Sequence, residues 1–388
     1  MKRSAPTDPS SRLQTPLAPG HQGKRACAAG PSGFTSGPLR RLTTPADLVA
    51  AGLAAPERLA ELEAVAERYA IGVTPALASL VRRSDPNDPV GRQFVPDARE
   101  LVQDPAETDD PIGDDVHSPV NGLVHRYPDR VLIKLLAVCA VYCRFCFRRA
   151  RVGPGSSSLT TAEFSAALDY VRARPEIWEV ILTGGDPLAL SPRRIAEIAT
   201  ALAAIPHVKV LRWHSRIPVA APERVTSALA RALLANGKTA VVAVHANHPR
   251  ELSPAAQAAC RRLAKVGVML VSQSVLLRGV NDDVETLEKL MRALVEAGVK
   301  PYYLHHGDLA PGTAHWRVPV ATGQALMRAL RGRLSGLATP TYMLDLPGGY
   351  GKVPISAATI RPDGPGRYVV ADRQGIERIY ADRLGAEP

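Results

Sequence analysis

The feature that most constrains the fold is an alternation of short apolar runs and helical segments between residues 130 and 306 of this 388-residue chain. Six runs of strand length alternate with five segments whose apolar residues recur at helical spacing. The runs are 130–136, 178–183, 208–213, 239–245, 268–276 and 300–306, and the helical segments are 160–173, 192–204, 222–236, 253–266 and 284–297. Strands this apolar are buried on both faces, so the pattern predicts a parallel sheet covered by helices.

Polar or glycine-rich residues follow each of the six runs. The stretch "CAVYCRFC" follows the first run, "GGDP" follows the second, and "HANHP" closes the fourth. In parallel α/β folds the functional groups gather at the carboxyl ends of the strands. The sequence therefore predicts an α/β protein built as a partial (β/α)6 TIM-like barrel, with one site at its mouth.

The rest of the chain divides by composition. Residues 1–42 are rich in Pro, Gly and Ser and carry one acid, Asp8, which predicts a disordered basic tail. Residues 43–118 are expected to form an N-terminal extension of helices and loops, where Thr44 caps a helix whose first residue is Pro45. Residues 119–356 form the predicted core with a functional C-terminal loop, and residues 357–388 form a C-terminal tail.

The net charge of +11 does not by itself predict a nucleic-acid partner, because the basic residues are scattered and form no stripe interleaved with aromatic residues. No apolar run approaches the roughly 18–20 residues of a membrane span. Cys27 and Cys260 stand apart from the remaining three cysteines, and a cluster of three cysteines is a poor disulfide framework. We therefore expect a cytoplasmic protein without a membrane or nucleic-acid partner.

Three cysteines lie within eight positions after the first apolar run: Cys139, Cys143 and Cys146. A structural zinc site needs four ligands, and no histidine lies within twelve residues of this cluster. A four-iron cluster held by three thiolates leaves one iron open for a substrate or cofactor. The iron–sulfur cluster is the favoured interpretation, ahead of zinc with a distant fourth ligand and of three buried thiols.

A lysine in the Gly/Pro-rich stretch "DLPGGYGKVP" is a second candidate. Lys352 does not belong to a nucleotide-binding P-loop, because Val353 follows it where Ser or Thr is required. Its amine could attach covalently to pyridoxal phosphate, or it could be an ordinary surface lysine.

The spacing C-x3-C-x2-C, with Phe145 before the third cysteine, resembles the radical S-adenosylmethionine superfamily. The stretch "TGGDP" (183–187) is similar to the glycine-rich motif of that superfamily. With "SPVNGLVHRYPDRVL" (118–132) and "DLPGGYGKVP" (345–354), the chain resembles the lysine 2,3-aminomutase family over residues 110–356. The likeness continues through "HANHP", "SQSVLLRGVND" and "PYYLHHGDL".

This resemblance implies three cofactors and a set of roles. A [4Fe–4S] cluster would be held by Cys139, Cys143 and Cys146. Pyridoxal phosphate would be bound by Lys352, the catalytic residue that attaches to it, with Arg126 and Arg130. S-adenosylmethionine would contact Thr183, Gly184, Gly185, Asp186, His245 and Gln273. The amino acid substrate would be bound by Arg148, Asp308 and Asp345.

The implied enzyme is an isomerase that moves the α-amino group of L-lysine to the β-carbon. Two carboxylates, Asp308 and Asp345, suit a buried distal ammonium. Arginine or ornithine would also fit a carboxylate pair. A branch that makes β-lysine for an elongation factor lacks the Asp before its Pro-Gly loop, so Asp345 argues against it. The sequence also leaves open a radical enzyme of a different reaction type and a zinc- or cluster-bearing nucleic-acid-binding protein.

Some positions depart from the family pattern. Phe145 stands where the family often has His, and Tyr350 stands where it has another glycine. Asp283 falls where clostridial-type relatives carry a ligand of an interface zinc, so no structural zinc is expected. The expected partners are a small amino acid, an electron donor of the flavodoxin or ferredoxin type, and, for a homo-oligomer, further copies of the chain.

Overall fold

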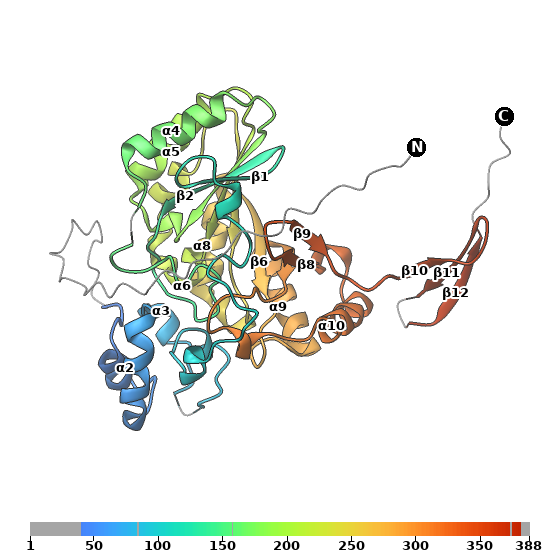
Figure 1. Cartoon of the computed structure of the whole chain (residues 1–388), viewed down its shortest axis with the longest axis horizontal. Helices are drawn as coiled ribbons and strands as arrows, with labels where there is room; N and C mark the ends of the chain where they lie inside the picture. The colour runs from blue at the N-terminus through green and yellow to red at the C-terminus, as the bar shows by residue number, and fades with distance from the viewer. Residues whose placement is uncertain (1–39, 84, 157, 373–374, 382–388) are drawn as a thin grey trace, which may run out of the picture. The chain divides into compact units, whose positions relative to one another are not determined.

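The computed structural model describes residues 40–83, 85–156, 158–372 and 375–381 (Figure 1). The predicted disordered tail therefore lies outside the described residues up to residue 39. Leu42, just before the expected boundary at residue 43, forms an antiparallel bridge with Val73.

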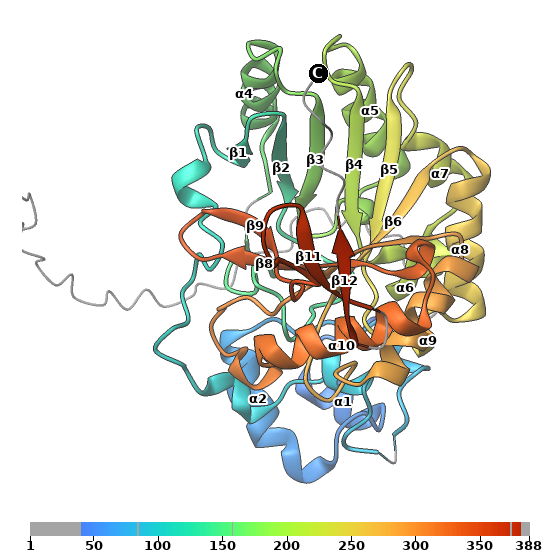
Figure 2. The ribbon, with the colours of Figure 1, turned by 90° about the vertical axis from the view of Figure 1, so that its right-hand side faces the viewer.

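One nine-stranded sheet runs in the order β1 to β9, and its strands β2 to β8 are parallel. The strands are β1 (Leu123–Tyr127), β2 (Arg130–Leu136), β3 (Glu179–Gly184), β4 (Val210–Ser215), β5 (Thr239–Val244), β6 (Met269–Val275), β7 (Lys300–His305), β8 (Thr341–Leu346) and β9 (Gly351–Pro354). β1 and β9 pair antiparallel at the two edges. Figure 2 shows β2 to β5 side by side. The predicted fold class is confirmed, and β8 adds a parallel strand that the sequence patterning did not identify.

Helices connect the parallel strands. They are α4 (Thr161–Arg172), α5 (Pro192–Ala203), α6 (Ile217–Ala220), α7 (Ser227–Ala232), α8 (Pro254–Lys265), α9 (Val284–Glu296) and α10 (Val320–Arg333). The prediction of one helix over 222–236 was wrong. A 3-10 turn occupies Pro222–Arg224, and α7 starts only after Thr226, whose hydroxyl accepts the Leu229 N–H at 3.1 Å. A hydroxyl placed this way satisfies a free amide of the first turn and fixes where the helix begins.

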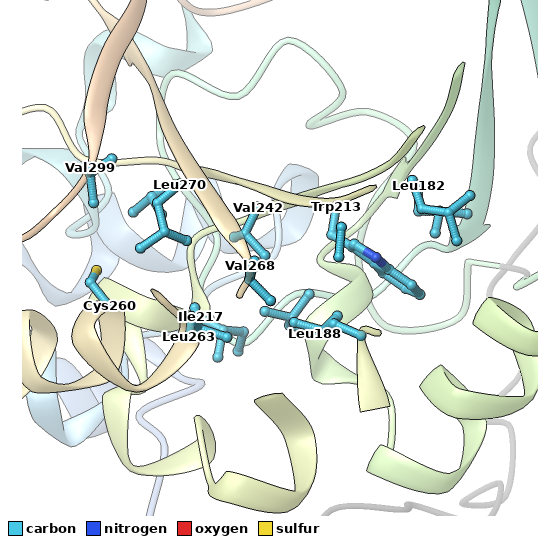
Figure 3. Close-up of a cluster of buried hydrophobic side chains, with 14 of the residues drawn as sticks. Leu182, Leu188, Trp213, Ile217, Val242, Cys260, Leu263, Val268, Leu270 and Val299 are labelled. Carbon is cyan, nitrogen blue, oxygen red and sulfur yellow. The ribbon is translucent and has the colours of Figure 1, made fainter. Parts of the chain in front are cut away.

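The main apolar core lies between the sheet and these helices. Trp213 and Val242 from neighbouring strands are fully buried, and Leu263 of α8 packs in the same cluster (Figure 3). Cys260 also points into this cluster, where burial raises the pKa of its thiol to about 12. Cys260 therefore acts as a small apolar side chain, because a thiol with so high a pKa has little thiolate to react.

The N-terminal extension builds a second apolar cluster against the cysteine-rich loop. The extension contains α1 (Pro45–Ala50), α2 (Leu59–Arg68) and α3 (Pro75–Ala78). Leu48, Leu77 and Phe94 are fully buried there, and Val141 of the cysteine-rich loop packs among them. The extension thus forms part of the support of that loop.

A buried carboxylate links the same extension to the loop by charge. Glu100 is fully buried and accepts hydrogen bonds from Arg144 Nε at 2.9 and 3.1 Å, and from Arg149 Nη2. The two guanidinium groups also donate to backbone oxygens, Arg144 to Ala70 at 2.8 Å and Arg149 to Gly312 at 3.1 Å. We call Glu100, Arg144 and Arg149 the ionic clamp.

The segment expected to be a C-terminal tail contains a small sheet. Strands β10 (Ile360–Pro362), β11 (Arg367–Ala371) and β12 (Glu377–Ala381) pair antiparallel in that order. In the described part of the chain, no helix combines the length and apolar character that crossing a membrane would require.

The ionic clamp yields a stability prediction. Glu100→Gln should lower the free energy of unfolding by about 3–5 kcal/mol, because it leaves two buried guanidinium groups without their counter-charge. Urea unfolding followed by circular dichroism would measure the change.

The matched control is Glu288→Gln. Glu288 also bonds two arginines, Arg292 and Arg333, but on the protein surface. We expect this variant to unfold close to the wild-type midpoint, since exposed pairs contribute little. Equal midpoints for the Glu100 and Glu288 variants would contradict the prediction.

Candidate active site

A cavity opens at the carboxyl ends of the parallel strands, where the sequence placed the site. Its wall contains nearly all of the predicted site residues: Cys139, Cys143, Cys146, Arg148, Thr183, Gly184, Gly185, Asp186, His245, Gln273, Asp308, Asp345 and Lys352. Arg126 and Arg130 are not part of this wall. The cavity therefore brings together residues that are more than two hundred positions apart in the chain.

The glycine motif sets the position of the cysteine-rich loop. Gly185 N–H donates to Leu136 O at 2.5 Å, and Asp186 N–H donates to Val138 O at 3.0 Å. Any Cβ at Gly185 would overlap the carbonyl of Val138, and Gly184 has a φ of +106°. Two glycines are required here, because only a backbone without side chains can approach the start of the loop this closely.

The three thiols lie in the cavity wall and are partly buried. Burial and the nearby Cys143 raise the pKa of the Cys146 thiol to about 11. Arg216 Nη1 donates to Cys143 Sγ at 3.4 Å. Thiols with raised pKa values stay protonated until a metal displaces their protons.

The spread of the thiols bears on which metal group they could hold. Among the described residues, no three His, Cys, Asp or Glu side chains converge closely enough for a single metal ion. A lone zinc holds each of its sulfur ligands at about 2.3 Å, whereas a four-iron cluster spreads its thiolates more widely. Three partly buried thiols line one cavity, with a guanidinium beside one of them, and thiolates are the ligands that iron–sulfur clusters use.

Asp186 ties two strand ends together. Its carboxylate accepts hydrogen bonds from Ser215 Oγ at 2.7 Å, Arg216 N–H at 2.7 Å, Ile217 N–H at 3.1 Å and Leu188 N–H at 3.0 Å. Burial nevertheless raises the pKa of this carboxyl group. With four donors in place, the carboxylate has little remaining capacity for a ligand.

Two histidines face the cavity with an unused nitrogen each. Burial, aided by the charge of Arg216, lowers the pKa of His245 to about 4. His214 also has a lowered pKa, again mainly from burial. Within the described residues, neither Nε2 atom has a hydrogen-bond partner. Buried ring nitrogens without a partner are unfavourable, so these atoms mark positions where a bound polar ligand fits.

Lys352 lies on strand β9, so the prediction that it belongs to a loop was wrong. The turn between β8 and β9 contains Gly348 and Gly349, with φ values of +82° and +86°. It brings Lys352 directly opposite Asp345, and Lys352 Nζ forms an ion pair with Asp345 Oδ2. Lys352 N–H also donates to Tyr127 Oη at 2.7 Å. The lysine is thus held on two sides and directed into the cavity.

Asp114 is a site residue that the sequence reasoning missed. It is almost fully buried and bonds Arg148 Nη2 at 2.9 Å and Arg126 Nη2 at 3.2 Å. Burial favours its neutral form, but Arg148, Lys134 and Arg126 outweigh that effect and keep the pKa of Asp114 below its ordinary value. The acidic pair at 114–115, just before "SPVNG", was the available sequence signal.

The two predicted phosphate-binding arginines differ in position. Arg126 donates to Asp345 Oδ1 at 3.0 Å, and its buried Nε has no partner among the described residues. Arg130 instead pairs with Asp129 at 2.7 Å and stacks on the Tyr127 ring, 3.9 Å from its centroid. The structure therefore places Arg126 beside the cavity residues and Arg130 one side chain further away, behind Tyr127.

Asp308 lies deep in the same cavity. Burial raises the pKa of its carboxyl group to about 7, with Lys352 opposing the shift and Asp345 adding to it. The group is therefore poised between its neutral and ionised forms near neutral pH. A cation bound beside it would favour ionisation.

Comparisons with known proteins agree with this geometry. The model of the radical SAM superfamily matches residues 133–294. An L-lysine 2,3-aminomutase from Clostridium subterminale is 39% identical over 318 residues, which cover 82% of this chain and 76% of that protein. An L-lysine 2,3-aminomutase from Fusobacterium nucleatum is 38% identical over 316 residues, or 81% of this chain and 74% of that protein. The chain belongs to the lysine 2,3-aminomutase family.

The protein is therefore a radical S-adenosylmethionine aminomutase, an isomerase whose family uses a [4Fe–4S] cluster, S-adenosylmethionine and pyridoxal phosphate. A glutamate 2,3-aminomutase from Clostridioides difficile is also similar, at 35% identity over 294 residues, which cover 76% of this chain and 69% of that protein. Membership of the family fixes the type of reaction, and the substrate has to be argued from the site residues of this aminomutase.

The raised pKa of Asp308 is open to direct measurement. In the ligand-free protein, its protonated carboxyl band in difference infrared spectra should disappear with a midpoint near pH 7. The folded state holds this proton above the ordinary value of 3.8, so wild-type stability should fall relative to Asp308→Asn as pH rises from 3.8 towards about 7. A carboxyl band unchanged in Asp308→Asn would show that another group is responsible.

Proposed function

We propose that the enzyme is an L-lysine 2,3-aminomutase, which moves the α-amino group of lysine to the β-carbon and forms β-lysine. The observation that carries this is the presence of Asp308 and Asp345 in the cavity wall that also contains Lys352 and the three cysteines. A distal ammonium is favoured between two carboxylates, whereas the distal carboxylate of glutamate would be repelled by them. The catalytic core would span residues 119–356, with residues 43–118 supporting the cysteine-rich loop.

Cys139, Cys143 and Cys146 would hold the [4Fe–4S] cluster. When bound, the cluster supplies the electron that cleaves S-adenosylmethionine, and pyridoxal phosphate carries the migrating amino group. Arg216, directed at Cys143 Sγ by Glu251 and by a 2.8 Å hydrogen bond to Gln93 Oε1, would keep positive charge beside one thiolate. A donor of this kind favours the more negative, reduced form of a cluster.

S-adenosylmethionine would lie along the glycine motif and the two histidine-bearing strand ends. The ligand could approach the backbone closely at Thr183, Gly184 and Gly185, and His245 offers it a neutral ring nitrogen. Gln273 lines the wall beside His245. Asp186 would act through the backbone that it holds, because its oxygens are already bonded.

Lys352 would attach to pyridoxal phosphate, with Arg126 and Arg130 near the phosphate. Asp345 Oδ2 forms an ion pair with Lys352 Nζ. Once the lysine amine is engaged elsewhere, this carboxylate becomes available to the distal ammonium of the substrate. Arg126 contacts Asp345, the ion-pair partner of Lys352, and Arg130 stacks on Tyr127, which accepts the Lys352 N–H. Each guanidinium group is therefore linked to Lys352 through one other residue and could reach a phosphate bound nearby.

Arg148 would bind the substrate carboxylate. Its guanidinium group lies in the cavity wall. Arg148 Nη2 donates to Asp114 Oδ2 at 2.9 Å, and Nη1 donates to Thr183 Oγ1 at 3.4 Å. A planar guanidinium can present two parallel N–H donors to a carboxylate. Lysine would then span the cavity from Arg148 at one end to Asp308 and Asp345 at the other.

Turnover of isotope-labelled L-lysine is the direct test. The anaerobically reconstituted enzyme, with S-adenosylmethionine, pyridoxal phosphate and dithionite, should form β-lysine detectable by mass spectrometry. Cys143→Ala and Lys352→Ala should abolish the product, because each removes a group that the reaction requires. Asp308→Asn should mainly raise KM for lysine, since it removes one carboxylate from the ammonium site.

Arginine, ornithine and glutamate serve as the comparison substrates. Turnover of arginine or ornithine without lysine turnover would show that the carboxylate pair serves another cation. Turnover of glutamate in preference to lysine would contradict the assignment of Asp308 and Asp345.

The attachment of pyridoxal phosphate can be tested apart from turnover. Borohydride reduction should fix one cofactor on the wild-type chain and none on Lys352→Ala. Lys134→Ala is the matched control, because Lys134 is a partly buried lysine of strand β2 that does not line the cavity. Arg126→Gln should weaken cofactor binding by roughly tenfold or more, the loss expected for a charged hydrogen bond. Retained labelling of Lys352→Ala would refute the assignment of Lys352.

A further inference from the structure

A second pocket shares one wall residue, Trp316, with the active-site cavity. Trp316 lines both the cavity and a groove formed by the N-terminal extension. The groove is rich in arginine, with side chains from Arg58, Arg82, Arg83, Arg92 and Arg99 in its wall. We call these five residues and the space between them the arginine groove.

A continuous series of contacts joins a predicted cluster ligand to this groove. Arg216 Nη1 lies 3.4 Å from Cys143 Sγ, and Arg216 Cζ lies 5.6 Å from the centroid of the Phe145 ring. Phe145 packs edge-on against Trp316, with their centroids 6.2 Å apart. Arg92 Cζ then lies 5.4 Å over the Trp316 ring. Phe145 and Trp316 thus connect the surroundings of Cys143 to the groove through ring contacts.

The groove wall also contains Asp85, Asp88 and Asp97, and Asp88 pairs with Arg250, so arginines outnumber acids in the wall by five to three. Arg58 and Arg99 pair with Glu61 and Asp97, each at 2.7 Å. In the part of the chain that the structure describes, Arg82, Arg83 and Arg92 have no acidic partner within 4.0 Å. Arg82 and Arg83 are exposed. Unpaired guanidinium groups on a concave surface create a local positive potential.

The proposed reaction needs an electron-transfer route to the cluster that does not pass through the substrate cavity. S-adenosylmethionine, pyridoxal phosphate and lysine would fill the cavity, and its chemistry requires that water be excluded. A protein electron donor therefore cannot reach the cluster through the cavity mouth. The Phe145–Trp316 pair offers a route from the groove that does not pass through the cavity mouth.

We propose that the arginine groove docks the one-electron donor of this enzyme, a small acidic electron-transfer protein that carries a reduced flavin or iron–sulfur centre. The donor loses one electron and the oxidised cluster gains it across Phe145 and Trp316, and no covalent bond forms or breaks. This inference rests on the proposed function, because it requires a cluster at Cys139, Cys143 and Cys146. Complementary charge would steer the encounter and speed it at low salt.

Stopped-flow reduction of the reconstituted cluster by an acidic flavodoxin in its hydroquinone form tests this inference. The variant Arg82→Glu/Arg83→Glu reverses two exposed charges that have no ionic partner, so its fold should be retained. The matched control is Arg328→Glu/Arg331→Glu, which reverses two exposed arginines of α10 outside the groove. Dithionite, a small reductant that needs no docking surface, is the reference in each case.

In the wild-type protein, the bimolecular rate constant for reduction by flavodoxin should fall as salt is raised. The groove variant should be slower by about tenfold or more at low salt and should lose most of this salt dependence. The α10 variant should behave as wild type, and dithionite should reduce all three proteins equally.

Four results would overturn the inference. An unchanged flavodoxin rate in the groove variant would exclude this surface. An equal loss in the α10 variant would show a general effect of net charge. Slower reduction of the groove variant by dithionite as well would indicate damage to the cluster site. If dithionite reduces no cluster in the wild-type protein, the proposed function itself fails, and the inference fails with it.

Discussion

The cysteine-rich loop depends on one buried carboxylate. Glu100 is fully buried and holds Arg144 and Arg149, which flank the last cysteine of the motif. A buried charge of this kind is tolerated only when its partners are complete, so the loop and the N-terminal extension must fold together. The extension is therefore part of the site, although none of the predicted cofactor or substrate ligands comes from it.

The geometry of the cavity follows from two different kinds of support. On one side the backbone of the glycine motif after β3 packs closely against the start of the cysteine-rich loop and donates hydrogen bonds to it. On the other side the β8–β9 hairpin sets Lys352 opposite Asp345 by strand register. Backbone contacts thus place the groups proposed for the cluster and for pyridoxal phosphate, and the arginines and carboxylates between them provide the polar contacts.

The sequence predicted the parallel core well, because its strands are apolar enough to be recognised one by one. It did not predict β1, β8, β9 or the small C-terminal sheet. The strands β9 to β12 are only three to five residues long and carry a weak local signal, and β8 (Thr341–Leu346) runs directly into the Gly/Pro-rich stretch that was interpreted as a loop. Asp114 was missed because its partners, Arg126 and Arg148, are defined only by tertiary contact. The double role of Trp316 was invisible for the same reason: no local pattern shows which two hollows a side chain separates.

The antiparallel strands at the two edges have a mechanical consequence. A closed barrel fixes its own circumference, because every strand is hydrogen-bonded to two neighbours around a ring. Here β1 and β9 satisfy β2 and β8 through local hairpins. No backbone ladder pairs β1 with β9 in the described residues, and the two edges are linked instead by Lys352 N–H to Tyr127 Oη and by Arg126 to Asp345 Oδ1. The width of the barrel at this seam therefore depends on side chains at the proposed site rather than on strand pairing.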